Sequence, residues 1–229
     1  MAFLLADKFT LSAFATFVDV LRLAADEGDR SRPIRCRWSV LSPDASARRS
    51  SCGVRVATEP LPPNPEAFDY VVVVGGLIDE RTRLDPRSET FVRRAAEANV
   101  PLVGLCTGVF ALYRAGVMAG YRACVSFFHR ADFLREFGDP EPVCDRIFLI
   151  DRSRLTSSGG ASAAHLAAAI VGRHLGEAAA RKSLSIMMID PALGEEAPQP
   201  LGTSPEDGAV LDVSHDPLVR RALALQRDA

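Results

Sequence analysis

Two short segments of this chain consist almost entirely of apolar residues and end at a tight turn. They are DYVVVVGG at residues 69–76 and VPLVGLC at residues 100–106. Apolar runs without polar alternation predict strands that are buried on both faces, as in a parallel sheet. Residues 86–98, between the two runs, have the length and pattern of a helix. This order predicts right-handed βαβ units and an α/β fold with a doubly wound, mostly parallel sheet flanked by helices.

The rest of the chain continues the alternation of strands and helices. We expect further strands at residues 3–6, 35–42, 122–127, 146–151 and 155–158, and a hairpin arm at 53–58. We expect further helices at residues 10–26, 129–136, 160–175 and 177–189. Residues 194–208 are rich in proline, glycine and acidic residues, which is typical of a linker. The sequence therefore predicts one domain at 1–193, a linker at 194–213 and a short helical segment at 214–229.

Composition narrows the classes of function. The chain has 229 residues, of which 48% are hydrophobic. Its net charge is -2, so we do not expect the chain as a whole to bind nucleic acid by electrostatic attraction. The five cysteines are widely spaced, which predicts neither a disulfide framework nor a zinc site, and we expect no cofactor. The apolar opening AFLLA is too short for a signal core or a membrane span. We therefore expect a protein of the reducing cytoplasm that does not associate with membranes.

The motif with the most chemical content is GLCTG at residues 104–108, between a predicted strand and a predicted helix. Its serine counterpart forms the nucleophile elbow, a sharp turn that holds one side chain above the carboxyl edge of a sheet. Amides at the start of the following helix would lower the pKa of the Cys106 thiol and could bind an anion. Gly75 and Gly76 end the adjacent strand, at the edge where open α/β sheets bind ligands. The alternative is that Cys106 is only a small buried residue in a tight turn.

A cysteine hydrolase also needs a base for the thiol and a third group that orients the base. Among the four histidines, only His129 lies just past the strand expected after the elbow helix. The alternative for His129 is an exposed residue in the first turn of a helix. His165 fits a packed position on an alanine-rich helix, and His174 fits a helix C-terminus, where the dipole favours a cation. No two histidines have metal-ligand spacing with an acid on a common face, so we expect no metal site.

Four segments together resemble the ThiJ/PfpI superfamily, whose fold is flavodoxin-like and similar to class I glutamine amidotransferases. They are FLLADKFTLSAFATFVDVLRLA, YVVVVGG, PLVGLCTGVFALYRAGVMAG and LTSSGGASAAHLAAAIVGRHLG, and the resemblance covers residues 1 to about 190. The sequence of these segments is most similar to the GlxA-type branch of AraC-family regulators, in which this domain precedes a helix-turn-helix region. The resemblance implies a homodimer, and it implies that residues 214–229 open a truncated DNA-binding region, so that DNA is bound only through a part absent here.

This chain departs from the enzymes of the superfamily at two positions. Those enzymes carry an acid on the first helix, where this chain has Ala13, and a histidine where it has Ser126. The resemblance therefore implies a sensor domain more than an enzyme, with a small nitrogenous metabolite, such as an amino acid or a quaternary ammonium compound, as effector. We expect the effector site to consist of Phe14, Gly75, Gly76, Leu77, Cys106, Thr107, Ser126 and Phe127.

Two other readings stay open at this point. One is a hydrolase, amidase or glyoxalase-like enzyme that uses Cys106 with His129 as its base. It requires His129 to come within about 3 Å of the sulfur, directly or through one water. The other is a redox sensor in which Cys106 is oxidised to sulfenic acid and Cys124 approaches it in space.

Overall fold

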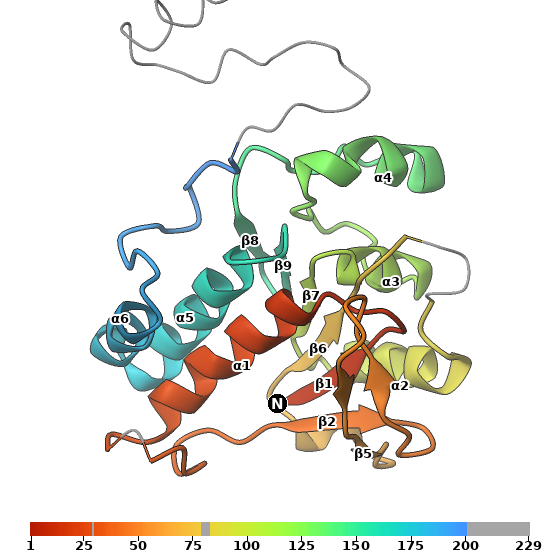
Figure 1. Cartoon of the computed structure of the whole chain (residues 1–229). Coiled ribbons are helices and arrows are strands. Elements are labelled where there is room, and N and C mark those ends of the chain that lie inside the picture. The colour runs from red at the N-terminus through yellow and green to blue at the C-terminus, as the bar shows by residue number, and fades with distance from the viewer. Residues whose placement is uncertain (29, 79–82, 201–229) are drawn as a thin grey trace, which may run out of the picture.

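The computed structural model describes residues 1–28, 30–78 and 83–200, and these form one twisted sheet between two layers of helices (Figure 1). The strand order in the seven-stranded sheet is β5-β2-β1-β6-β7-β9-β8. The strands are β1 (Ala2–Leu5), β2 (Ser39–Ser42), β5 (Glu59–Pro60), β6 (Val71–Val74), β7 (Leu102–Leu105), β8 (Phe148–Asp151) and β9 (Arg154–Ser157). Only the edge strand β8 runs antiparallel to its neighbour, while the other pairs are parallel. The predicted doubly wound, mostly parallel sheet is thus confirmed.

The central strands are buried on both faces because each face is covered by helices. In β6, Val72 and Val74 pack into the core under one helical layer, while Val71 and Val73 pack into the core under the other. The first layer contains α1 (Leu11–Ala25), α5 (Ser162–Leu175) and α6 (Glu177–Ile186), and the second contains α2 (Pro86–Glu97) and α3 (Gly108–Arg114). Figure 1 shows the two layers on opposite sides of the sheet. This double coverage explains why β6 and β7 read as unbroken apolar runs.

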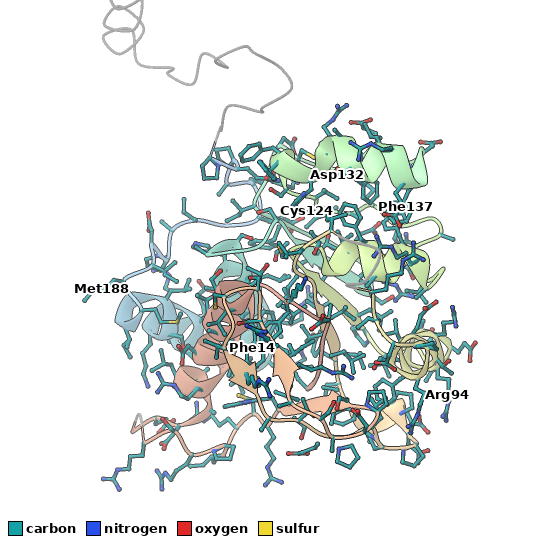
Figure 2. All side chains as sticks on the ribbon, turned by 45° about the vertical axis from the view of Figure 1, so that its right-hand side comes forward. Phe14, Arg94, Cys124, Asp132, Phe137 and Met188 are labelled. Atoms are coloured by element: carbon teal, nitrogen blue, oxygen red, sulfur yellow. The ribbon has the colours of Figure 1, made fainter. Side chains whose placement is uncertain are left out.

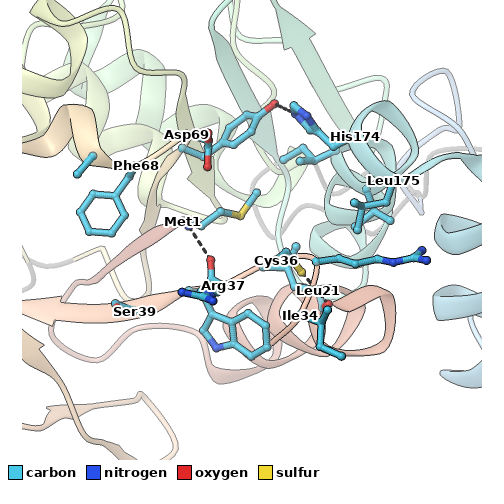
Figure 3. Close-up of a pocket in the computed structure, with 16 residues that line it drawn as sticks. Met1, Leu21, Ile34, Cys36, Arg37, Ser39, Phe68, Asp69, His174 and Leu175 are labelled. Atoms are coloured by element: carbon cyan, nitrogen blue, oxygen red, sulfur yellow. Dashed lines mark hydrogen bonds between the residues drawn. The ribbon is translucent and has the colours of Figure 1, made fainter. Parts of the chain in front are cut away.

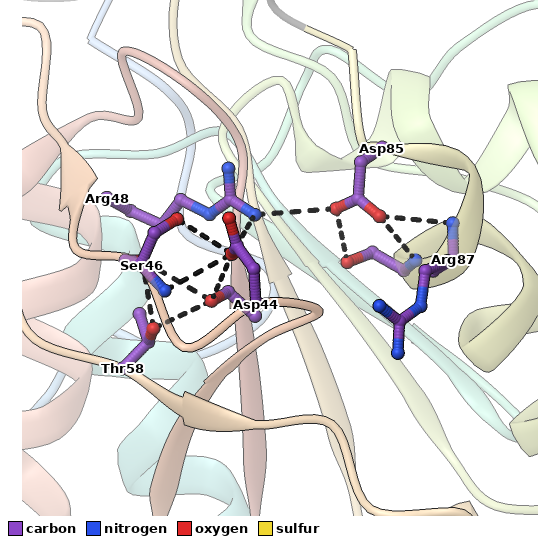
Figure 4. Close-up of polar contacts among 8 residues, drawn as sticks. Asp44, Ser46, Arg48, Thr58, Asp85 and Arg87 are labelled. Atoms are coloured by element: carbon purple, nitrogen blue, oxygen red, sulfur yellow. Dashed lines mark hydrogen bonds and ion pairs between the residues drawn. The ribbon is translucent and has the colours of Figure 1, made fainter.

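A small antiparallel hairpin, β3 (Arg48–Arg49) and β4 (Arg55–Val56), projects from the sheet between β2 and β5, as its sequence predicts. The Arg48 guanidinium lies 3.8 Å from the Asp44 carboxylate and 3.6 Å from that of Asp85 (Figure 4). Asp85 is also the N-cap of α2, where its carboxylate accepts hydrogen bonds from two backbone N–H groups. The hairpin is therefore tied to the start of α2.

One predicted strand is wrong. Residues 122–127 form only an isolated bridge, between Cys124 and Val143, and then enter a 3-10 turn, η3 (Phe127–His129), followed by α4 (Arg130–Phe137). Side chains take two of the backbone N–H groups of this segment: the Cys124 N–H donates to Thr156 Oγ1 and the Phe127 N–H donates to Gln199 Oε1. A strand ladder does not form here because these polar groups are satisfied by side chains instead of a neighbouring strand.

Two other boundaries differ from the prediction by a few residues. The strand expected at 35–42 is ordered as a strand only over Ser39–Ser42, and the helix expected to reach 189 ends at Ile186. Met188, just after that helix, has a positive φ of 56° and a side chain that is 92% exposed and projects from the body (Figure 2). In the described part of the chain, no helix combines the length and the apolar character needed to cross a membrane.

Candidate functional site

The GLCTG motif forms a sharp turn between β7 and α3. Cys106 is the turning residue and has φ = +56°, a left-handed conformation that L residues other than glycine, asparagine and aspartate seldom adopt. Its N–H donates to the carbonyl of Ser157 in the neighbouring β9, so the turn is held at the carboxyl edge of the sheet. The cysteine elbow predicted from the motif and its flanking elements is therefore confirmed in geometry.

The glycines around the elbow are required by close backbone packing. A methyl group added at Gly75 would lie 2.1 Å from the amide nitrogen of Gly108, and one added at Gly76 would lie 1.8 Å from the Lys8 carbonyl oxygen. We expected Gly75 to be part of the effector site. Its N–H already donates to the carbonyl of Leu105, however, so this group is not available to a ligand. These glycines bring the β1–α1 loop, the end of β6 and the elbow into direct contact.

The Cys106 thiol has two neighbours that sequence reasoning did not assign to the site. Its sulfur lies 3.5 Å from the hydroxyl of Thr10, the N-cap residue of α1. Gly159, with φ = +103°, covers the other side, and a methyl group there would lie 3.0 Å from the sulfur. The SSGG stretch after β9 carries the signal that could have found Gly159, since it repeats the pattern of a strand ending in a glycine pair. The thiol is thus half-buried between a hydroxyl and a glycine turn.

The acid and the base that a cysteine enzyme needs are not seen in contact with the thiol. Ala13, at the position expected for the acid, is fully buried in the core, and the Thr10 hydroxyl is a hydrogen-bond partner of the sulfur. His129 bonds through Nδ1 to Asp132 at 3.1 Å, and its ring packs against Phe110 and Phe128. The contacts that fix His129 thus belong to α3, η3 and α4, and among the described residues no direct hydrogen bond joins it to Cys106.

The remaining expected site residues fall into two groups. Thr107 and Phe14 are buried. The Thr107 hydroxyl donates to the Gly76 carbonyl at 2.7 Å. The Phe14 ring makes edge contacts with Phe3 and Phe9, inside the molecule (Figure 2). Ser126 and Phe127 are half-buried at the start of η3, and Leu77 is 52% exposed. Of these five, Ser126, Phe127 and Leu77 have surface left for a ligand.

Cys124 is placed poorly for redox chemistry with Cys106. Its thiol is fully buried and donates to the carbonyl of Arg146 at 3.2 Å. Burial, reinforced by the nearby Cys144, raises the pKa of the Cys124 thiol far above its ordinary value. Because the thiolate is the reactive form, Cys124 is a poor resolving cysteine. No disulfide joins any of the five cysteines, all of which lie in the described ranges.

A cavity of about 550 Å³ opens at the opposite, amino-terminal edge of the sheet (Figure 3). Its walls include Trp38, Phe68 and Tyr70, and the Tyr70 hydroxyl hydrogen bonds with His174 Nε2 at 2.8 Å. Carboxylate and guanidinium groups both line it, from Asp69 and from the arginines at 35 and 37. This cavity is separate from the elbow, which lies at the carboxyl edge. Over the described ranges, no three His, Cys, Asp or Glu side chains converge to hold a metal ion.

A cysteine elbow at the carboxyl edge of a doubly wound parallel sheet defines a flavodoxin-like α/β protein with a nucleophile-elbow site. The chain belongs to the DJ-1/PfpI family, whose model matches residues 1–173. It is 34% identical over 176 residues to the HTH-type transcriptional regulator GbdR of Pseudomonas aeruginosa, which covers 77% of this chain and 47% of the relative. It is 32% identical over 168 residues to the HTH-type transcriptional regulator CdhR of the same species, again 47% of the relative. The chain therefore spans about half the length of these curated relatives.

Solved structures support the same assignment. An AraC family transcriptional regulator from Pseudomonas putida superposes with a TM-score of 0.68 and 27% identity, over 81% of this chain and 97% of that one. Oxidised DJ-1 from Toxoplasma gondii has a TM-score of 0.64 at 18% identity, over 82% of this chain and 97% of that one, and shows the shared fold. The family resemblance inferred from the four sequence segments is confirmed.

Proposed function

We propose that this chain is the ligand-sensing domain of a transcriptional regulator and that a small metabolite binds beside Cys106. The observation that carries the proposal is the 34% identity with an HTH-type regulator over 176 residues, a match that takes up only 47% of that regulator. A regulator needs a second, DNA-contacting part, and the unmatched half of the relative is long enough to contain one. In this proposal the protein acts in the cytoplasm as a homodimer.

The division of the chain follows from the same proposal. Residues 1–193 form the sensor, residues 194–213 connect it to the next domain, and residues 214–229 begin a helix-turn-helix region that binds DNA. The segment 214–229 lies outside the described residues. The net charge of -2 on this chain is consistent with DNA contacts being made by another part of the protein.

The contacts of the elbow favour sensing over catalysis. The Thr10 hydroxyl lies beside the thiol, while His129, the base of the enzyme reading, is held by Asp132 and its aromatic neighbours. The elbow offers a half-buried sulfur and the Thr10 hydroxyl at an edge where ligands bind in open α/β sheets, and Ser126 and Phe127 are partly exposed at the start of η3. We infer an effector in the class of amino acids or quaternary ammonium compounds.

A thermal-shift screen of amino acids and quaternary ammonium compounds tests the proposal. The Thr10→Leu variant fills the space beside the thiol, and the matched control Trp38→Ala alters only the cavity at the other edge. We expect one compound class to raise the Tm of the wild type and of Trp38→Ala but not of Thr10→Leu. The proposal fails if no compound raises the Tm, or if the effect is lost in Trp38→Ala and kept in Thr10→Leu.

The second candidate function is a cysteine enzyme, favoured by one observation, the strained elbow at Cys106. The chain is also 32% identical over 85 residues to "Deglycase PfpI" of Pyrococcus furiosus, a match that covers 36% of this chain. Consumption of methylglyoxal by the wild type and by Cys106→Ser separates the two functions. We expect equal, background rates, while a wild-type rate well above that of Cys106→Ser would establish the enzyme.

A further inference from the structure

Gln199 lies 26 residues beyond the last residue matched by the family model, yet its side chain is only 5% exposed. Its Nε2 donates to the carbonyl oxygens of Val125 and Arg146, each at 2.8 Å. Its Oε1 accepts the N–H of Phe127 at 2.9 Å. Both N–H groups and the oxygen of the amide are therefore used, and all three main partners are backbone groups of the sensor body.

Gln199 ends a segment that is docked along the start of β8. We name residues 195–199 the strap. The Ile147 N–H donates to the carbonyl of Ala197 at 2.9 Å, and Arg146 forms an ion pair with Glu196 at 2.9 Å. Figure 1 shows this part of the chain passing beside β8 on its way out of the domain. The strap is thus the last described stretch before the residues that continue toward the rest of the chain.

The strap and the elbow hold the same piece of chain from two sides. Residues 123–127, which include the expected ligand contacts Ser126 and Phe127, are named the wall. On one side, the Cys124 N–H donates to Thr156 Oγ1 in β9, the strand whose next residue accepts the Cys106 N–H. On the other side, Gln199 bonds to Val125 and Phe127. Three hydrogen-bonded steps therefore connect the elbow backbone with the strap: from Cys106 to β9, from β9 to the wall, and from the wall to Gln199.

The chemistry of the contact demands an amide at position 199. Two carbonyl oxygens and one N–H face the side chain, and only asparagine or glutamine offers two donors and an acceptor together in one planar group. A carboxylate at this position would face two carbonyl oxygens without a donor. An apolar side chain would leave the Val125 carbonyl and the Phe127 N–H unpaired, and would leave the Arg146 carbonyl with only the weak thiol donor of Cys124.

We propose that Gln199 is a positioning residue that couples the elbow site to the chain beyond residue 200. A ligand that displaces the wall must break the bonds of Gln199 and loosen the strap, and release of the strap must loosen the wall by the same free energy. That an effector drives this exchange rests on the proposed function, whereas the coupling of wall and strap does not.

Amide hydrogen exchange on the full 229-residue chain, without any ligand, tests the coupling. The Phe127 N–H reports the wall, and the Ile147 N–H reports docking of the strap. In Gln199→Glu we expect both amides to exchange about tenfold faster or more. The two bonds donated to the carbonyls of Val125 and Arg146 are lost, and a buried carboxylate that faces these oxygens should undock the strap from the wall. The control Glu196→Gln weakens an exposed ion pair of the same strap and leaves the Phe127 rate near that of the wild type.

A second variant keeps the test decisive if Gln199→Glu does not fold. Gln199→Asn keeps the amide but shortens the side chain, so it should accelerate both amides less than Gln199→Glu. Perturbing the wall from the other side with Thr156→Val should in turn accelerate Ile147. The proposal is overturned if Phe127 exchanges faster while Ile147 does not, or if Thr156→Val leaves Ile147 unchanged. Because no ligand is present, these results are independent of the effector screen.

Discussion

The sulfur of Cys106 lies 3.5 Å from the hydroxyl oxygen of Thr10, where a cysteine enzyme of this fold would need an acid and a base. Thr10 reaches the thiol because its own N–H is bonded to the Gly75 carbonyl, which fixes the first turn of α1 against the elbow. A hydroxyl can share a hydrogen bond with the thiol but cannot draw off its proton near neutral pH. The pair is therefore in keeping with the proposed sensor function.

In the turn that covers the thiol, a side chain should be more destabilising at Gly159 than at Gly160. In Gly159→Ala, the new methyl would lie 2.8 Å from Cys106 Cβ at φ = +103°, so we expect a loss of about 1–3 kcal/mol in the free energy of unfolding. In Gly160→Ala, at φ = +56°, no heavy atom lies within 4 Å of the new methyl, and the loss should be about 1 kcal/mol. Urea unfolding measures both, and equal losses would contradict this account of the elbow.

The hydroxyl of Thr107 should contribute to stability through one buried bond. Thr107→Val keeps the shape but leaves the Gly76 carbonyl without this donor, so we expect a loss of about 1–3 kcal/mol. Thr90→Val is the control, since the Thr90 hydroxyl bonds to the Pro86 carbonyl on an exposed part of α2, and its cost should stay within about 0.5 kcal/mol. The comparison is made by chemical denaturation, and an effect no larger than that of Thr90→Val would argue against a tightly closed elbow.

Asp85 should stabilise the start of α2 mainly as a cap. Asp85→Ala removes the acceptor for the N–H groups of Arg87 and Ser88 and should cost about 1 kcal/mol (Figure 4). Asp85→Asn keeps a capping oxygen but loses the attraction to Arg48 at 3.6 Å and the oxygen that accepts the Ser88 hydroxyl, so it should cost less than Asp85→Ala. A cost for Asp85→Asn as large as that for Asp85→Ala would mean that the ion pair, and not the cap, is the main contribution.

The stability of the fold should depend on pH through His165. Burial lowers the pKa of this ring, against the opposing effects of the Asp190 carboxylate and a backbone group of Leu193, and its Nδ1 has no hydrogen-bond partner among the described residues. The folded state thus favours the neutral ring. The stabilisation is complete above about pH 6.5 and is lost as the pH falls below that value toward the folded pKa.

Urea unfolding of the wild type and of His165→Gln between pH 7.5 and 5.5 measures this dependence. We expect the free energy of unfolding of the wild type to fall on acidification and the variant to show a flatter profile. Parallel profiles would show that the ring titrates alike in the folded and unfolded states.

The sequence predicts those parts of the fold that are set by local apolar patterning. The runs around Val72 and Val103 had to be buried strands because no polar residue interrupts them, and the elbow at Cys106 followed from its glycines and its place between a strand and a helix. These features depend on neighbours in the chain. They were predictable for that reason.

The parts that were missed depend on contacts between distant segments. The predicted strand at 122–127 fails because Thr156 and Gln199 take its N–H groups, and neither residue is near it in the sequence. Thr10 and Gly159 reach the thiol from loops 96 and 53 residues away, and periodicity carries no information about such approaches. Gln199 lies in a stretch whose composition indicates a linker, although its side chain is buried.

The most direct test of a sensor site at the elbow is a map of amide chemical-shift changes when the compound that raises the Tm is titrated into the protein. We expect the largest changes at Thr10, Cys106, Phe127 and Gly159, with little change around Trp38 and Tyr70. Changes concentrated at Trp38 and Tyr70, with the elbow amides unmoved, would contradict the account and place the effector in the cavity at the opposite edge of the sheet.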